Sequence, residues 1–148
     1  MSFSHFIYHI VFSTKNRYPT ITTLYERTMY KILYSLITNE GGHVYRIGGM
    51  PDHVHLLIDM PATLSPAKFI QKIKQESSYI AKDMKEFPQW DGWEKGYGAF
   101  TYSYGEIDAI KHYIINQKEH HKKVSFRDEY REWLLENGIS PDAPYFPQ

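Results

Sequence analysis

The pattern of hydrophobic and polar positions changes its period several times along the first sixty residues. A β-branched and aromatic run over residues 3–14 predicts a strand. From residue 22 or 23 to residue 40, apolar side chains recur at the spacing of a helix face that packs on a core. Two further strands are predicted over residues 44–47 and 53–60, because the glycine, proline and aspartate between them are turn residues. This part of the chain therefore predicts a strand, a helix and a hairpin.

The rest of the chain shows the same helical and strand spacings of apolar residues. Ser65 has the side chain of a helix N-cap, and Pro66 suits the first helical position. The pattern predicts, in order, a helix over residues 66–85, a loop over 87–96, a strand over 97–103, a helix over 106–121 and an amphipathic segment over 126–136 that Gly138 and two prolines end. No internal repeat or low-complexity tract interrupts this order.

The order of the elements predicts the fold class. It is the order of an α+β fold: a ferredoxin-like, or RRM-like, antiparallel sheet with helices on one face, plus an extra helix. With 148 residues the chain is in the size range of one domain, so we expect a single domain over residues 1–148. The other face of the sheet is then left for a site or a partner.

Two histidines stand on the second strand of the hairpin. On a strand, His53 and His55 share one face, while Val54, Leu56 and Ile58 share the other. If the apolar residues pack against the helices, both histidines point to the free face. Two imidazoles at this spacing can hold one metal ion, although two packing or surface histidines would have the same pattern.

Composition and charge limit the kinds of metal ligand and of binding partner that the chain can have. The chain has no cysteine, so a metal must be held by histidine, carboxylate, amide or water. Leu57 stands where common histidine-rich hydrolase motifs need another histidine. The net charge is zero, so overall charge does not indicate a nucleic-acid binder. Because neither a leader-like N-terminus nor an apolar stretch of about 20 residues occurs, we expect a cytoplasmic protein without membrane contact.

A tyrosine and a glutamine are placed for chemistry on the helix over residues 106–121. Tyr113 and Gln117 are four residues apart, so the hydroxyl and the amide share one helix face. A metal-binding histidine pair together with a tyrosine suggests phosphodiester chemistry. Because the chain has 13 tyrosines, a packing role for Tyr113 is the alternative.

Together these segments resemble a known family. Residues 9–15 look like the first strand, residues 50–57 like the histidine–hydrophobic–histidine signature and residues 113–117 like the helical Tyr-x-x-x-Gln motif of the single-tyrosine HUH-endonuclease transposases of the insertion sequence 200/605 group. Residues 96–100 fall where that family has its last strand. The resemblance runs over nearly the whole chain, and the motifs occur in the family's order.

The resemblance implies a transposase that cleaves and rejoins single-stranded DNA at the ends of a mobile element, which imperfect hairpins mark. Tyr113, on the catalytic-tyrosine helix, would attack the scissile phosphorus and form a 5′-phosphotyrosine. A divalent metal ion, Mg²⁺ or Mn²⁺, would be held by His53, His55 and Gln117. The active family enzyme is a homodimer whose active sites are shared between subunits, so we expect a homodimer here.

Basic residues that can contact DNA phosphates are spread along the chain. The candidates are Lys15, Arg17, Arg46, Lys68 and Lys72. Toward the C-terminus, acidic residues such as Glu129 alternate with basic ones, and we interpret this part as a solvated helix surface. His120 lies seven residues after Tyr113, nearly on the same helix face, so it could approach the metal or the phosphate. The interpretation that we favour is that His120 and His121 stabilise the C-terminal end of their helix through its dipole.

Other functions fit parts of the pattern. A non-catalytic module that binds single-stranded nucleic acid could use the same sheet and would need neither Tyr113 nor a metal. A metal-dependent phosphodiesterase would use water in place of Tyr113. A domesticated relative that processes palindromic repeats of its host genome would have the same motifs as a mobile-element enzyme. The sequence leaves these alternatives, the DNA sequence and the physiological metal open.

Overall fold

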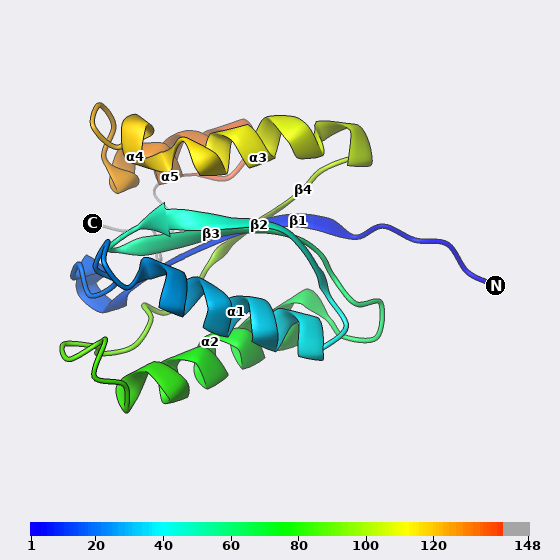
Figure 1. Cartoon of the computed structure of the whole chain (residues 1–148). Coiled ribbons are helices and arrows are strands. Elements are labelled where there is room, and N and C mark those ends of the chain that lie inside the picture. Colours follow the sequence, from blue (N-terminus) through cyan, green and yellow to red (C-terminus); the bar gives the residue numbers. More distant parts are fainter. Residues whose placement is uncertain (141–148) are drawn as a thin grey trace.

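Four antiparallel strands form one sheet in the order β2-β3-β1-β4 (Figure 1). The computed structural model describes residues 1–140. The strands are β1 (Ile7–Ser13), β2 (His43–Met50), β3 (His53–Asp59) and β4 (Gly98–Thr101). β1 pairs with β3 over its whole length and with β4 on its other side. This is the α+β, ferredoxin-like arrangement that the order of the elements predicts.

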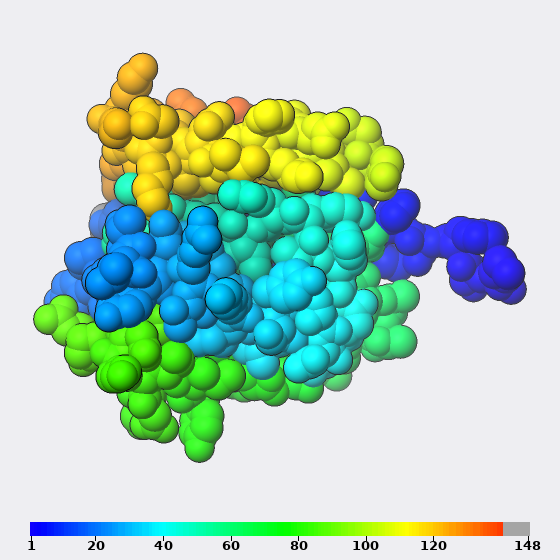
Figure 2. All heavy atoms as spheres, viewed as in Figure 1, coloured from blue at the N-terminus to red at the C-terminus, as the bar shows by residue number. Residues whose placement is uncertain are grey.

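Helices cover both faces of the sheet, as Figure 1 shows. One face carries α1 (Glu26–Asn39) and α2 (Pro66–Lys82), and the other carries α3 (Ile107–Ile115), α4 (Gln117–His120) and α5 (Phe126–Glu136). Single turns of 3-10 helix, η1 (Lys15–Arg17) and η2 (Tyr104–Glu106), follow β1 and precede α3. In Figure 2 the yellow and orange atoms of α3 and α4 lie directly on the cyan atoms of the hairpin. The face that was expected to be free is therefore covered by the tyrosine helix and the last helix.

Alternation along β3 divides its side chains between the two layers. Val54, Leu56 and Ile58 belong to the core under α1 and α2 and are almost fully buried, as the period predicts. The same core includes Ile10, Phe12, Met29, Leu33, Ile37, Phe69, Ile70 and Ile73. Burial of apolar surface at roughly 25 cal/mol per Å² is the main force that holds these helices on the sheet. Because the apolar set fixes which face is inward, it also fixes the face on which the histidines lie.

The second layer packs on the histidine face through smaller apolar clusters. One contains Ile7, Leu57, Ile107 and Ile114, and another contains Phe100 and Leu134. Gly48 permits the close approach of α3 to β2, because a Cβ there would lie 2.7 Å from Cγ2 of Ile114 and 3.0 Å from its carbonyl oxygen. This glycine therefore sets how near the tyrosine helix lies to the hairpin.

Some element boundaries differ from the prediction. The helix expected over residues 106–121 is interrupted at Asn116, whose φ of −90° and ψ of 15° separate α3 from α4. Asparagine side chains compete for backbone hydrogen bonds, which favours helix ends. β1 begins at Ile7 because its pairing partner, Asp59, is the last residue of β3. β2 extends to Met50, beyond the expected 44–47, and α2 ends at Lys82.

The ends of α2 and α5 follow the predicted signals. The Ser65 side chain accepts a hydrogen bond from the backbone N–H of Lys68 at 3.2 Å, as an N-cap does. Gly138 follows α5 with a φ of +72°. The two prolines expected after it, and the last part of the expected domain, lie outside the described residues. Within residues 1–140, no helix is long and apolar enough to cross a membrane.

Candidate metal and tyrosine site

His53 and His55 lie between the sheet and the second layer of helices, and both are fully buried. Nδ1 of His53 is 2.7 Å from Oδ1 of Asp52, in the hairpin turn. Since a carboxylate can only accept, this Nδ1 carries a proton. Although burial acts to raise it, the hydrogen bond with His53 lowers the pKa of Asp52. Histidines that bind metals are commonly held by a carboxylate in this way.

A second histidine holds His55. Nε2 of His9, on β1, is 2.9 Å from Nδ1 of His55, and both rings are fully buried. Burial lowers the pKa of His55 to about 4 and lowers the pKa of His9 well below its usual value. Both rings are therefore neutral near pH 7, which is the form of imidazole that binds metal ions.

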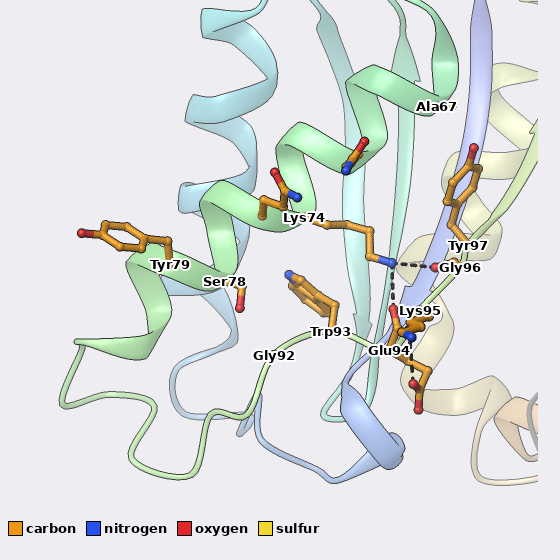
Figure 3. A pocket seen from close by; sticks show the side chains of 12 residues that line it. Ala67, Lys74, Ser78, Tyr79, Gly92, Trp93, Glu94, Lys95, Gly96 and Tyr97 are labelled. Carbon is orange, nitrogen blue, oxygen red and sulfur yellow. Dashed lines mark hydrogen bonds between the residues drawn. The ribbon is translucent and has the colours of Figure 1, made fainter.

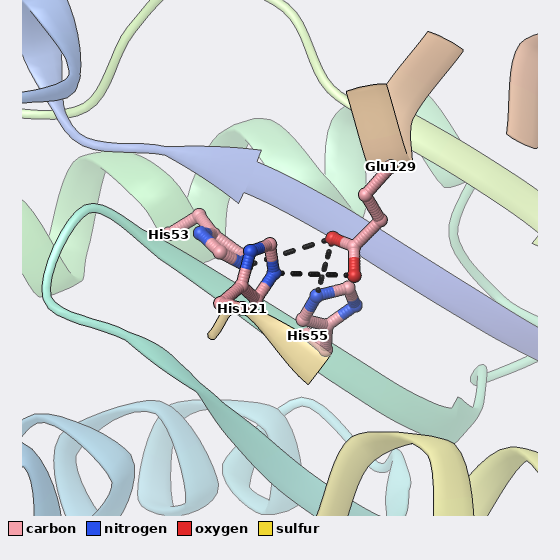
Figure 4. Close-up of side chains that lie close together, drawn as sticks. All are labelled: His53, His55, His121 and Glu129. Carbon is pink, nitrogen blue, oxygen red and sulfur yellow. Dashed lines mark ion pairs between the residues drawn. The ribbon is translucent and has the colours of Figure 1, made fainter. Parts of the chain in front are cut away.

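Glu129 reaches into this site from α5 and is only 3% exposed. Its Oε1 is 3.2 Å from Nε2 of His55 and 3.7 Å from Nε2 of His53. Its Oε2 is 3.2 Å from Nε2 of His121, at the end of α4. Figure 4 shows the three imidazoles and the carboxylate converging from β3, α4 and α5. Burial acts to raise the pKa of Glu129, but the surrounding histidines lower it, so the carboxylate stays ionised.

Tyr113 and Gln117 meet the histidines at the same place. Oε1 of Gln117 is 3.0 Å from Nε2 of His53, and its Nε2 donates to Oε2 of Glu129 at 3.0 Å. The Tyr113 hydroxyl also donates to Oε2 of Glu129. Burial and the Glu129 carboxylate raise the pKa of Tyr113, which keeps the phenol protonated. The structure thus brings together all four of the site residues predicted for metal binding and catalysis.

The donor atoms fit a divalent metal ion. Among the described residues, Nε2 of His55, Nε2 of His121 and Oε1 of Glu129 are buried and make no hydrogen bond, although ion-pair distances join them. One ligand atom from each of His53, His55, His121 and Glu129 can be chosen so that all lie within 4.8 Å of one another. Ligands at about 2.1 Å from an ion are roughly 3.0–3.4 Å apart when adjacent and about 4.2 Å apart when opposite. A bound ion would satisfy atoms that otherwise lack partners.

Comparisons with known proteins identify the family. The model of the family described as transposase IS200 like matches residues 2–117. The chain belongs to the IS200-like transposases. The ISDra2 transposase TnpA of Deinococcus radiodurans is 26% identical over 117 residues, which cover 76% of this chain and 84% of that protein.

Solved structures agree with this assignment. The crystal structure of a transposase from Deinococcus radiodurans R1 has a TM-score of 0.59 and 26% identity, and covers 78% of this chain and 93% of its own. The structure of a REP-associated tyrosine transposase bound to a REP hairpin has a TM-score of 0.61 and 12% identity. The match covers 84% of this chain and 74% of that structure's chain. The similarity to the REP-associated structure shows that the protein described here has the same fold.

Three residues of the site were not predicted. The interpretation of Glu129 as part of a solvated surface is wrong, because the residue is buried. The available signal was its spacing from Phe126 and Trp133, which places a carboxylate on the apolar stripe of α5. His121 does end α4, as expected, but its ring also faces Glu129. His9 had no local signal, since its contact with β3 depends on how the strands pair.

The basic candidates are distributed over different elements of the transposase. Lys15 and Arg17 lie in η1, Arg46 is exposed on β2, and Lys68 and Lys72 are exposed on α2, which covers the face opposite the histidines. Nζ of Lys72 is 2.5 Å from Oε1 of Glu40. DNA contacts of these five residues stay a prediction.

A separate hollow of about 730 Å³ lies between α2 and residues 92–97 (Figure 3). Lys74 points across it and donates to the carbonyl oxygens of Glu94 at 2.8 Å and Gly96 at 2.7 Å. Burial lowers the pKa of Lys74 to about 8. Trp93 lines the same hollow and donates from Nε1 to Ser77 at 2.9 Å. These contacts hold the loop on α2, on the other side of the sheet from His53 and His55.

Proposed function

We propose that this transposase cleaves and rejoins single-stranded DNA at the hairpin-marked ends of a mobile element through a 5′-phosphotyrosine on Tyr113. The observation that carries the proposal is the packing of Tyr113 and Gln117 against the histidine pair of β3, around donor atoms that lack partners. One structural relative is bound to a REP hairpin, which supports a hairpin as the substrate.

In the proposed reaction, the Tyr113 oxygen forms a bond to phosphorus while the bond from phosphorus to the 3′ oxygen breaks. The phenol gives up a proton, and the leaving 3′ oxygen takes one up. Because burial and Glu129 raise the pKa of Tyr113, the phenol is a weak nucleophile in the conformation described here. A divalent ion, Mg²⁺ or Mn²⁺, would favour the phenolate and polarise a phosphate oxygen.

His53, His55 and Gln117 are the ligands that we propose for this ion. Nε2 of each imidazole faces the site, and the Gln117 oxygen lies 3.0 Å from Nε2 of His53.

The homodimer with active sites shared between subunits is also part of the proposal. Within one chain, the Tyr113 ring already lies 5.8 Å from the ring of its own His55, measured between centroids. Sharing would require α3 and α4 to exchange between two copies, with Gly105 before α3 as the hinge. Since the substrate is DNA, the proposed location is the cytoplasm.

The proposal is tested with labelled single-stranded hairpin DNA and Mg²⁺ or Mn²⁺, by looking for a protein–DNA adduct that survives denaturation. We expect the adduct with the unmodified protein and its complete loss with Tyr113→Phe. Tyr34→Phe, on the exposed side of α1, is the matched control and should leave the adduct unchanged.

Each other outcome favours a rival function. Cleavage without an adduct, unchanged by Tyr113→Phe, would make water the nucleophile and the protein a phosphodiesterase. Binding of hairpins without cleavage, in the presence of either ion, would favour the non-catalytic binding module.

A further inference from the structure

Glu129 and His121 lie after the last residue of the family match, which ends at Gln117. Both nevertheless face the histidine pair of β3 at the distances given above. The family signature therefore does not account for two of the four groups that could hold an ion here.

The two oxygens of Glu129 face different partners. Oε2 is occupied, since the Tyr113 hydroxyl and the Gln117 amide both donate to it. Oε1 has no hydrogen-bond partner and faces Nε2 of His55 and His53. A buried carboxylate oxygen this close to two imidazole nitrogens requires a cation or a proton between them.

The ring of His121 supports the same arrangement. Its Nε2 is buried without a hydrogen-bond partner, and its ring centroid is 4.7 Å from that of His53. With Nε2 3.2 Å from Oε2 of Glu129, the ring completes a set of donors on several sides of one position (Figure 4). The placement of α4 and α5, and not only that of β3, thus determines the donor set.

We propose that His121 and Glu129 bind the same ion as His53, His55 and Gln117, so that three imidazoles, a carboxylate and an amide oxygen form a site that prefers Zn²⁺ or Mn²⁺ to Mg²⁺. The inference rests on the proposed function and deepens it by naming the class of metal. Imidazole nitrogen favours transition-metal ions and Zn²⁺, whereas Mg²⁺ favours oxygen ligands and retains its water. The Glu129 carboxylate supplies an anionic ligand that the histidines and Gln117 cannot provide.

The test is isothermal titration of the metal-free full chain with Zn²⁺, Mn²⁺ and Mg²⁺. The unmodified protein should bind Zn²⁺ and Mn²⁺ at least tenfold more tightly than Mg²⁺, and Glu129→Gln should weaken Zn²⁺ and Mn²⁺ binding by roughly 10-fold or more. Glu136→Gln removes an equal charge from the exposed end of α5 and should bind like the unmodified protein. Equal affinity of the Glu129→Gln variant would overturn the inference.

Cobalt absorption gives a second measurement that does not depend on affinity. The visible spectrum of bound Co²⁺ should change with Glu129→Gln and with His121→Gln, because each removes one ligand, and an unchanged spectrum in both would refute the assignment. If Glu129→Gln does not fold, Glu129→Asp keeps the charge, shortens the reach and should still shift the spectrum.

His53→Ala separates this inference from the proposed function. Loss of Co²⁺ binding in His53→Ala with an unchanged spectrum in Glu129→Gln would refute only the role of Glu129. Unchanged Co²⁺ binding in His53→Ala would refute the metal site of the proposed function itself.

Discussion

His9 is joined to His55 by a side-chain hydrogen bond, with its Nε2 2.9 Å from Nδ1 of His55. For His55 to offer the lone pair of Nε2, its Nδ1 must carry the proton and donate it to His9. We expect His9→Leu to weaken divalent-ion binding by about 10–100-fold, because the orientation and tautomer of His55 are then no longer held. Isothermal titration with Mn²⁺ or Zn²⁺ measures the change.

A conservative variant separates this positioning role from packing. Gln at position 9 can place an oxygen near the former Nε2, so His9→Gln should retain most of the affinity that His9→Leu loses. Equal affinity for the ion in both variants and in the unmodified protein would show that His55 does not depend on His9.

At the scale of single residues, the sequence predicted the groups whose relation is local. His53 and His55 share a strand face, and Tyr113 and Gln117 share a helix face. The side-chain repeat of a strand or a helix was therefore enough to predict that the members of each pair lie together. Glu129 could not be placed in the same way. Its role depends on α5 folding back over the sheet, which no spacing within α5 specifies.

Gly48 controls the position of a whole element, because it lies where α3 touches β2. Gly48→Ala places a methyl group 2.7 Å from Ile114, one residue after Tyr113, so the helix must shift by a few tenths of an ångström. We expect a loss of about 1–3 kcal/mol of stability and a slower formation of the Tyr113 adduct. Thermal unfolding and the rate of adduct formation measure these effects.

Gly105 offers the matched control for this prediction. It precedes α3, and a Cβ there would have no heavy atom within 4 Å. Gly105→Ala should therefore unfold like the unmodified protein, and it is a control for stability only, because Gly105 is also the proposed hinge of α3. Comparable losses in both variants would mean that backbone freedom, and not the approach of α3, determines the effect of Gly48.

At the scale of elements, every strand and most helices were predicted, since each has a clear period. The break at Asn116 was not predicted, because the apolar residues on both sides keep helical spacing. The sequence also did not predict that α3, α4 and α5 cover the histidine face of the sheet. A helix with one apolar stripe must be buried somewhere, but the stripe of α5 does not say on which surface.

For the molecule as a whole, a bound ion should couple to folding. The donor set is buried between two layers and exists only when both are assembled, so an ion at 100 times its Kd stabilises the fold by about 2.7 kcal/mol. For a chain of this size we expect Tm to rise by roughly 5–10 °C on adding Zn²⁺ or Mn²⁺ to chelator-treated protein. Differential scanning calorimetry measures the shift.

His53→Ala provides the reference for this measurement. It removes one donor and should abolish most of the rise in Tm, while the chelator-treated variant still unfolds cooperatively. An unmodified protein with the same Tm in chelator and in metal would contradict the coupling.

The order of the elements along the chain has a consequence for how the protein is made. The sheet and both histidines of β3 are complete at Thr101, whereas Tyr113, Gln117 and Glu129 all follow. A chain synthesised from its N-terminus can fold the sheet on α1 and α2 before Tyr113, the nucleophile that we propose, exists. A product that stops early after β4 therefore keeps the apolar core under α1 and α2, together with the histidine pair, but lacks the proposed nucleophile.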